Sequence, residues 1–292
     1  MLKDITSSDL HSLDANPELE EDQYTILQTY IDRLVRRFRE DEIQIRIVVA
    51  GSRSKGYHLQ HWSDFDLLLV YENGFPLHGH VKSDGITMEN VIFDNQGQPL
   101  SAASFYNKTQ LIVHEVSGTL ADCIVVFHPR SQHQISLDLQ SGKIKLECDI
   151  LTAIPNPLIP GDNFFVPYGR SSDNWFLASV AQQKKIANTF ATNYPGSTDL
   201  IRLLKYMKYS RDWKIRSMVL ELCVWYFLVE HGDTWKLEPA TNLKMILPYI
   251  SQKLSQNVRI HCFKHPGGFN VPEPDAHQVI DEIKTIIDKN SS

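Results

Sequence analysis

The chain has 292 residues, of which 42% are hydrophobic and 22% are charged, and its formal net charge is −6. This composition is ordinary for a globular protein with a sizeable core, and it excludes a strongly basic nucleic-acid-binding protein. The sequence has neither an apolar run of about 18 residues nor the apolar core of a signal peptide, so we expect no membrane span and no secretion. Its four cysteines are widely separated and form no C-x-x-C pair, so we expect a cytoplasmic protein without structural zinc.

The first predicted elements are one helix and two strands. Residues 20–41 place apolar side chains at spacings of three and four, which indicates an amphipathic helix. Residues 42–50 carry alternating apolar side chains and predict a strand that leads into a turn at Gly51-Ser52. The apolar run after Ser63 predicts a second, largely buried strand over residues 64–71.

The rest of the chain changes from β-like to helical patterns. Residues 72–140 are rich in Gly, His, Asn and Ser and predict hairpins and loops, with β-like runs at 111–113 and 123–127. Residues 143–151 alternate with a period of two, which indicates a strand that ends at Pro155. Helices are predicted over residues 172–192, 198–210, 215–231, 241–255 and 275–288. The order of elements predicts an α+β fold with a mixed, β-rich first half and a helical second half.

Three aspartates are the candidate catalytic residues. Asp64 and Asp66 are two apart on a predicted strand, so their carboxylates lie on one face and repel each other. A hard cation such as Mg²⁺ relieves that repulsion and keeps positions open for substrate phosphates. Asp149 occupies a polar, outward-facing position on its own strand, and a third carboxylate is what a two-metal phosphoryl displacement requires. The Gly51-Ser52 turn would supply N–H groups for a triphosphate.

Each of these residues also has a purely structural explanation. Asp-x-Asp occurs often by chance, and Ser63-Asp64 could form a turn at the edge of the strand. Asp149 alone would be an exposed strand residue. The combination with the upstream Gly-Ser turn favours the catalytic interpretation.

The motif resembles the signature of DNA polymerase β-like nucleotidyltransferases, and most closely that of the 2′-5′-oligoadenylate synthase family, which is kin to cyclic GMP–AMP synthase. The matching residues are Gly51-Ser52-x-x-Lys55-Gly56-x-x-Leu59-x-x-x-Ser63-Asp64-x-Asp66. Residues 148–153 resemble the third-aspartate strand of that family, and residues 200–205 and 219–222 resemble two of its helices. The resemblance implies a mixed-sheet catalytic lobe over residues 1–158, including the N-terminal helix. A helical lobe over residues 159–292 would close the active-site cleft.

The resemblance also implies roles for individual residues. Asp64 and Asp66 would bind two Mg²⁺ ions, for which Mn²⁺ could substitute, and Asp149 would bind one ion and help deprotonate the acceptor ribose hydroxyl. The implied nucleotide-binding residues are Gly51, Ser52, Lys55, Ser63, Arg202, Lys205 and Ser217. Arg202 and Lys205 share one helical face, which could equally be a solvated basic face.

The sequence departs from the family pattern at several points. Tyr57 replaces the threonine usual after Gly56, so a bulky phenol would stand where a small hydroxyl lies near the phosphates. Met218 stands where an aromatic residue often stacks on the donor base, which leaves base preference open. The Cys/His zinc insertion of vertebrate cyclic GMP–AMP synthase is absent.

The implied activity is synthesis of 2′-5′-linked oligoadenylate from ATP or another NTP, yielding a nucleotide second messenger. The alternative on the same scaffold is a cyclic di- or trinucleotide synthase, because it needs the same catalytic residues. A non-catalytic RNA sensor and a drug-modifying nucleotidyltransferase are further alternatives. The intact aspartate set argues against the sensor, and the family-like helices argue against the drug-modifying enzyme.

Double-stranded RNA is a candidate activator, which family members of this kind bind on a basic surface. The candidate RNA-binding residues are Arg33, Arg36, Arg37, Arg39, Lys184 and Lys185. Phosphate contacts from such a surface would make binding salt-dependent. Acidic residues flank the arginines on both sides, so a solvated amphipathic helix explains the charges as well. A constitutive enzyme or another activating ligand is the rival, and the oligomeric state stays open.

Overall fold

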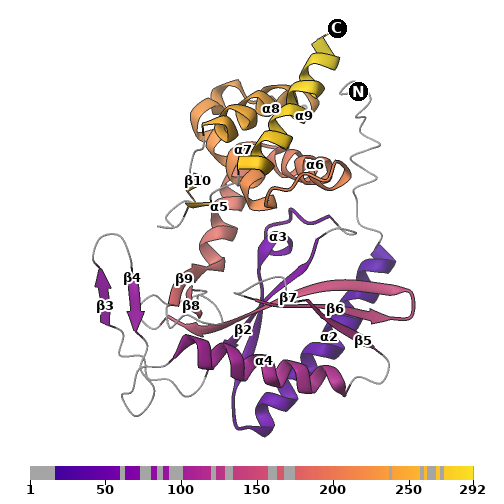
Figure 1. The fold of residues 1–292 in the computed structure, drawn as a ribbon, viewed down its shortest axis with the longest axis vertical. Helices are drawn as coiled ribbons and strands as arrows, with labels where there is room; N and C mark the ends of the chain where they lie inside the picture. Colours follow the sequence, from indigo (N-terminus) through magenta and orange to yellow (C-terminus); the bar gives the residue numbers. More distant parts are fainter. Residues whose placement is uncertain are drawn as a thin grey trace. The chain divides into compact units, whose positions relative to one another are not determined.

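The computed structural model describes residues 17–59, 63–72, 80–83, 88–91, 101–119, 123–128, 134–156, 163–167, 175–236, 239–256, 260–261, 268–269 and 273–291 (Figure 1). In these ranges no helix is both long enough and apolar enough to cross a membrane. The structure is a mixed α+β fold with a central sheet and a helical C-terminal region, as the sequence predicts.

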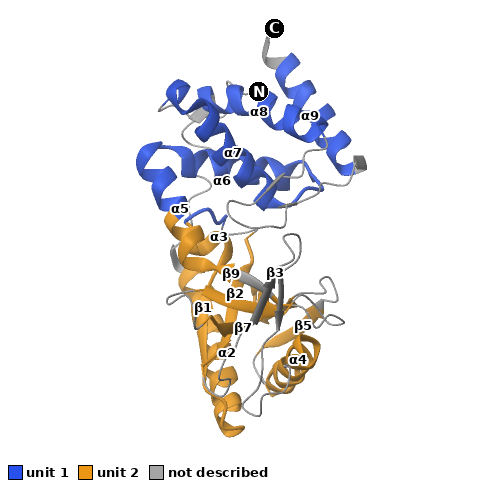
Figure 2. Ribbon diagram, turned by 90° about the vertical axis from the view of Figure 1, so that its left-hand side faces the viewer, with its two compact units in different colours: residues 1–15, 56–62, 186–292 blue, residues 16–55, 63–185 orange. Residues whose placement is uncertain are grey.

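The chain forms two compact units, which Figure 2 colours separately. The sheet unit contains residues 16–55 and 63–185, and the helical unit contains residues 1–15, 56–62 and 186–292. Two strands after residue 158 pair with the sheet, directly or through each other, and so lie in the sheet unit. The predicted lobes over residues 1–158 and 159–292 stay a prediction. That the helical lobe closes over a cleft stays a prediction.

The central sheet of the sheet unit has seven strands, in the order β1-β2-β7-β6-β5, with β8 pairing with β7 and β9 with β8. The strands β2 and β7 are parallel neighbours, whereas the other pairs in this sheet are antiparallel. Their bounds are β1 Ile45–Val49, β2 Phe65–Tyr71, β5 Ile124–His128, β6 Ile135–Ser141, β7 Ile144–Pro155, β8 Asn163–Pro167 and β9 Trp175–Ser179. A separate two-stranded sheet joins β3 His80–Ser83 to β4 Met88–Val91.

Two helices, α2 Pro17–Glu40 and α4 Ala102–Gly118, pack on one face of this sheet (Figure 1). Alternate residues of β2, such as Leu67 and Leu69, join the apolar stripe of α2 in one buried core. Residues of opposite parity, such as Leu68 and Val70, join a smaller apolar cluster on the other face. Asp66 has this second parity, so the sheet itself directs its side chain away from α2 and α4.

Two predicted segments need correction. Residues 102–118 form the helix α4, where hairpins and loops were expected, and the run at 111–113 is not a strand. The short apolar run at 111–113 lies within a longer helical pattern, whose buried positions include Phe105, Thr109 and Ile112. Residues 175–179 form β9 rather than the start of a helix, because they pair with β8, and α5 Val180–Asn193 begins only afterwards.

In the part of the helical unit that the structure describes, four helices and short connecting elements follow α5. Their bounds are α6 Ser197–Ser210, α7 Ser217–His231, η1 Gly232–Thr234, α8 Pro239–Ser255, β10 Ile260–His261, β11 Gly268–Phe269 and α9 Glu273–Ser291. Helix α7 is buried along most of its length, including Val224 and Trp225, because the neighbouring helices surround it. The predicted helices at 198–210, 215–231, 241–255 and 275–288 are therefore confirmed within a few residues.

Candidate active site

The sheet brings the predicted aspartates together. In the parallel ladder of β2 and β7, Asp66 is the register partner of Asp149. Asp64 precedes β2 by one residue, so its side chain has the same parity as that of Asp66. All three carboxylates are therefore presented at the start of β2, on the sheet face opposite α2 and α4.

The Gly-Ser turn packs directly against this carboxylate group. The short helix α3 Gly51–Ser54 follows β1, and the N–H of Ala50 donates to the carbonyl of Asp66 at 2.8 Å. Gly51 has a positive φ of 61°, and a Cβ built on it would lie 1.6 Å from Oδ2 of Asp66. Only glycine fits at this position, because both the backbone conformation and the neighbouring carboxylate exclude a side chain.

The electrostatics of Asp64 show that the acidic side chains share one site. The pKa of Asp64 is raised to about 7, mostly by burial and in addition by the nearby charges of Asp149, Glu147 and Asp66. A hydrogen bond with Glu147 adds to this effect. Glu147 is thus a fourth carboxylate of the site, and sequence reasoning missed its role. The sequence contained a signal for this role, because Glu147 lies two residues before Asp149 on an alternating strand and therefore shares its face of the sheet.

This raised pKa predicts the pH dependence of the metal-free protein. An aspartate free in water has a pKa of 3.8, whereas the pKa of Asp64 in the folded chain is about 7. Between these two pH values the folded state therefore binds more protons than the unfolded state. The free energy of unfolding should therefore be highest at the acidic end of this window and fall as pH rises through about 7. Urea unfolding in EDTA at several pH values should show this fall, and Asp64→Asn should remove it. Equal slopes for both proteins would contradict the assignment.

The donor chemistry fits a divalent cation. Oxygen ligands from three carboxylates suit Mg²⁺, and a cation would relieve the repulsion that raises the pKa of Asp64. Among the described residues, however, no group of three or more His, Cys, Asp or Glu side chains is arranged to hold a metal ion. The two-ion site therefore stays a prediction.

A buried arginine supports the carboxylate site. The side chain of Arg53 is only 2% exposed, and its guanidinium lies over the ring of Phe65 at 3.6 Å. It contacts Glu20 and the carbonyl of Ser63, each at 3.5 Å. Burial lowers the pKa of Arg53, while the nearby charges of Glu20 and Asp64 raise it. Arg53, which sequence reasoning overlooked, therefore anchors the residue just before Asp64.

The predicted nucleotide-binding residues fall in both units. Gly51, Ser52, Lys55 and Ser63 belong to the sheet unit, around the turn and the start of β2, whereas Arg202, Lys205 and Ser217 belong to the helical unit. Among the first set, Ser52 and Ser63 are half-buried and Lys55 is buried. Their nucleotide contacts stay predictions.

Two of the predicted nucleotide-binding residues in the helical unit, Arg202 and Lys205, contact other residues of that unit. Lys205 is buried, and its Nζ donates to the carbonyl of Tyr57 at 3.0 Å. Arg202 lies 3.8 Å from Asp199 on the same helix, and Ser217 is the first residue of α7. Tyr57 itself is buried in the core of the helical unit, and its place near the phosphates stays a prediction.

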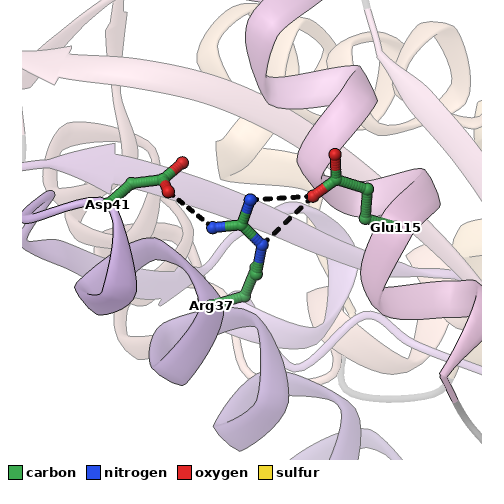
Figure 3. Close-up of polar contacts among 3 residues, drawn as sticks. All are labelled: Arg37, Asp41 and Glu115. Atoms are coloured by element: carbon green, nitrogen blue, oxygen red, sulfur yellow. Dashed lines mark hydrogen bonds and ion pairs between the residues drawn. The ribbon is translucent and has the colours of Figure 1, made fainter.

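The candidate RNA-binding residues on α2 make contacts within the sheet unit. Figure 3 shows that Arg37 binds both Asp41, one turn along, and Glu115 of α4. The shortest N···O distances are 2.7 Å to Asp41 and 2.9 Å to Glu115. These hydrogen bonds raise the pKa of Arg37. Arg33 donates to the carbonyl of Thr119 at 2.9 Å, and so both arginines link α2 to α4.

The other candidate RNA-binding residues lie on exposed positions. Arg36 and Arg39 are exposed on α2, and Lys184 and Lys185 are exposed on α5. RNA binding by this set stays a prediction.

The fold is consistent with one class of protein. A mixed sheet followed by a helical region, with an Asp-x-Asp strand beside a parallel strand that carries a third aspartate, is consistent with a polymerase β-like nucleotidyltransferase domain. Residues 31–113 match a family model described as a nucleotidyltransferase domain. The matched segment includes the Gly-Ser turn, Asp64 and Asp66, but ends before Asp149. No curated protein matches the chain. The match supports nucleotidyl transfer from an NTP as the general chemistry.

Proposed function

We propose that this chain synthesises 2′-5′-linked oligoadenylate from ATP. The observation that carries the proposal is the register of Asp66 with Asp149 across parallel strands, with Asp64 directly before β2 and Gly51 of the Gly-Ser turn against Asp66. The spacing of the motif from Gly51 to Asp66, which resembles that of oligoadenylate synthases, supports the finer assignment.

In the proposed reaction, the ribose hydroxyl oxygen of one nucleotide attacks the α-phosphorus of another. The bond from that phosphorus to the bridging oxygen breaks, and pyrophosphate leaves. Asp149 takes up the proton of the attacking hydroxyl, for which its carboxylate must be ionised. Ser52 and the N–H groups of the turn hold the triphosphate, and Gly51 lets it lie close to Asp66. Divalent cations bound by the aspartates would neutralise charge that develops on the phosphate oxygens.

Product analysis tests this proposal. Purified protein would be incubated with Mg²⁺ and the four labelled NTPs, with and without double-stranded RNA, and the products treated with phosphatase and a 3′-5′-specific nuclease. We expect adenylate ladders that resist the nuclease and lose only their terminal phosphates. A compact product that resists phosphatase would instead identify a cyclic-nucleotide synthase.

The same experiment tests activation. A ladder that forms only with RNA would support a basic activating surface that includes Arg36, Arg39, Lys184 and Lys185. Because Arg33 and Arg37 bind groups of the sheet unit, their replacement should lower stability as well as RNA binding. Equal product with and without RNA would exclude RNA as the activator.

A further inference from the structure

A glutamine that no motif identifies contacts the third aspartate. Gln134 directly precedes β6, and its side-chain amide donates from Nε2 to Oδ2 of Asp149. A carboxylate can only accept, so the nitrogen of the amide must face Asp149. The same nitrogen lies 3.4 Å from the hydroxyl of Ser136, which is the register partner of Asp149 across β6 and β7.

The backbone of Gln134 is held in turn by helix α4. The hydroxyl of Tyr106 donates to the carbonyl of Gln134 at 3.1 Å, and Tyr106 is 1% exposed. A buried tyrosine ring in a packed core has little freedom, so this bond limits where the Gln134 side chain begins. Asp149 is thus restrained from both sides, by β2 through its register with Asp66 and by β6 through the glutamine.

We propose that Gln134 is a positioning residue for Asp149, on which Tyr106 acts through the Gln134 backbone. This inference rests on the proposed function, because it assigns Asp149 a role in metal binding and proton transfer. An amide suits the task, since it holds one carboxylate oxygen by a hydrogen bond without cancelling the negative charge. A lysine or arginine at this position would hold the carboxylate equally well but would neutralise it.

The test measures Mn²⁺ binding to the full chain by calorimetry, with a non-hydrolysable ATP analogue present. Gln134→Met keeps the length of the side chain and removes the donor, and we expect it to weaken Mn²⁺ binding about 10- to 100-fold. Tyr106→Phe should weaken it by a smaller factor. Gln140→Met, the same substitution at an exposed glutamine further along β6, is the matched control and should bind as the wild type does. Thermal unfolding of each variant shows that it is folded.

A double-mutant cycle separates positioning from general disturbance of the sheet. If Gln134 acts through Asp149, Gln134→Met should add nothing to the loss caused by Asp149→Asn. In turnover assays the single variant should lower kcat more than it raises KM for the nucleotide.

The outcomes also separate this proposal from the proposed function. Wild-type affinity in Gln134→Met, with weak binding in Asp149→Asn, would overturn the positioning role alone. Tighter binding in Gln134→Met would overturn it as well, because Gln134 would then withhold Asp149 from the metal. If Asp149→Asn binds Mn²⁺ normally, or if the wild type binds none, both proposals fail.

Discussion

Asp149→Asn is expected to abolish nucleotidyl transfer while leaving the fold and nucleotide binding largely intact. Asparagine has the same shape, and its side-chain oxygen can still accept the hydrogen bond from Gln134. It has no charge for a cation and cannot accept the proton of a ribose hydroxyl. Loss of a general base alone lowers rates by about 100- to 10,000-fold, and loss of a metal ligand adds to this. Pyrophosphate release and nucleotide titration would measure the two quantities separately.

The control for this variant is Asp138→Asn, two register positions along the same pair of strands. Asp138 is buried, binds Nζ of Lys145 at 2.8 Å, and is the register partner of Glu147 rather than of Asp149. Its replacement should lower the unfolding temperature and retain turnover. Retained turnover in Asp149→Asn would overturn the three-aspartate mechanism.

Gly51→Ala should have the second-largest effect, because it introduces a methyl group where the Asp66 carboxylate lies. The new Cβ would lie 1.6 Å from Oδ2, and also 2.8 Å from Cβ of Asp66, so rotation of the carboxylate alone would not relieve the clash. Either the turn or the strand must move. A displacement of about 1 Å in an active site can cost roughly 100-fold in rate, and we expect a loss of at least this order. Initial rates of pyrophosphate release would measure it.

Gly142→Ala is the matched control for backbone strain. Gly142 also has a positive φ, 58°, but a Cβ built there has nothing within 4 Å. Both variants place alanine in the left-handed region, which costs about 1–2 kcal/mol. We therefore expect similar losses from strain but a loss of turnover only for Gly51→Ala. Equal activity of the two variants would show that the approach of Gly51 to Asp66 has no catalytic role.

The local part of the site is predictable because it depends on short-range geometry. Asp64 and Asp66 share a face through the two-residue period of a strand, and the turn at Gly51 follows from residue type and spacing. The outward parity of Asp149 is confirmed in the same way, since Leu146, Cys148 and Ile150 beside it are buried.

Other residues gained or changed their role through long-range contacts. Gln134 and Tyr106 meet only because α4 packs beside the start of β6, and α4 itself was not predicted. Lys205 shares a helical face with Arg202, as spacing predicts, yet it is buried against the carbonyl of Tyr57. Arg37 falls at helical spacing with other arginines, but Glu115 from α4 binds it. Periodicity reports which side of an element a residue occupies, and it contains no information on which element covers that side.

The α+β class, the Asp-x-Asp strand after a Gly-Ser turn and the helical second half are predictable from residue types and spacing, because each depends on neighbours within a few residues. The parallel pairing of β7 with β2, in the register that pairs Asp149 with Asp66, depends instead on long-range contacts. That register arises from the burial of apolar side chains on both faces of the sheet, since a shift by one residue would turn Asp149 into the core of α2 and α4. It also brought Glu147 and Gln134 to the aspartates.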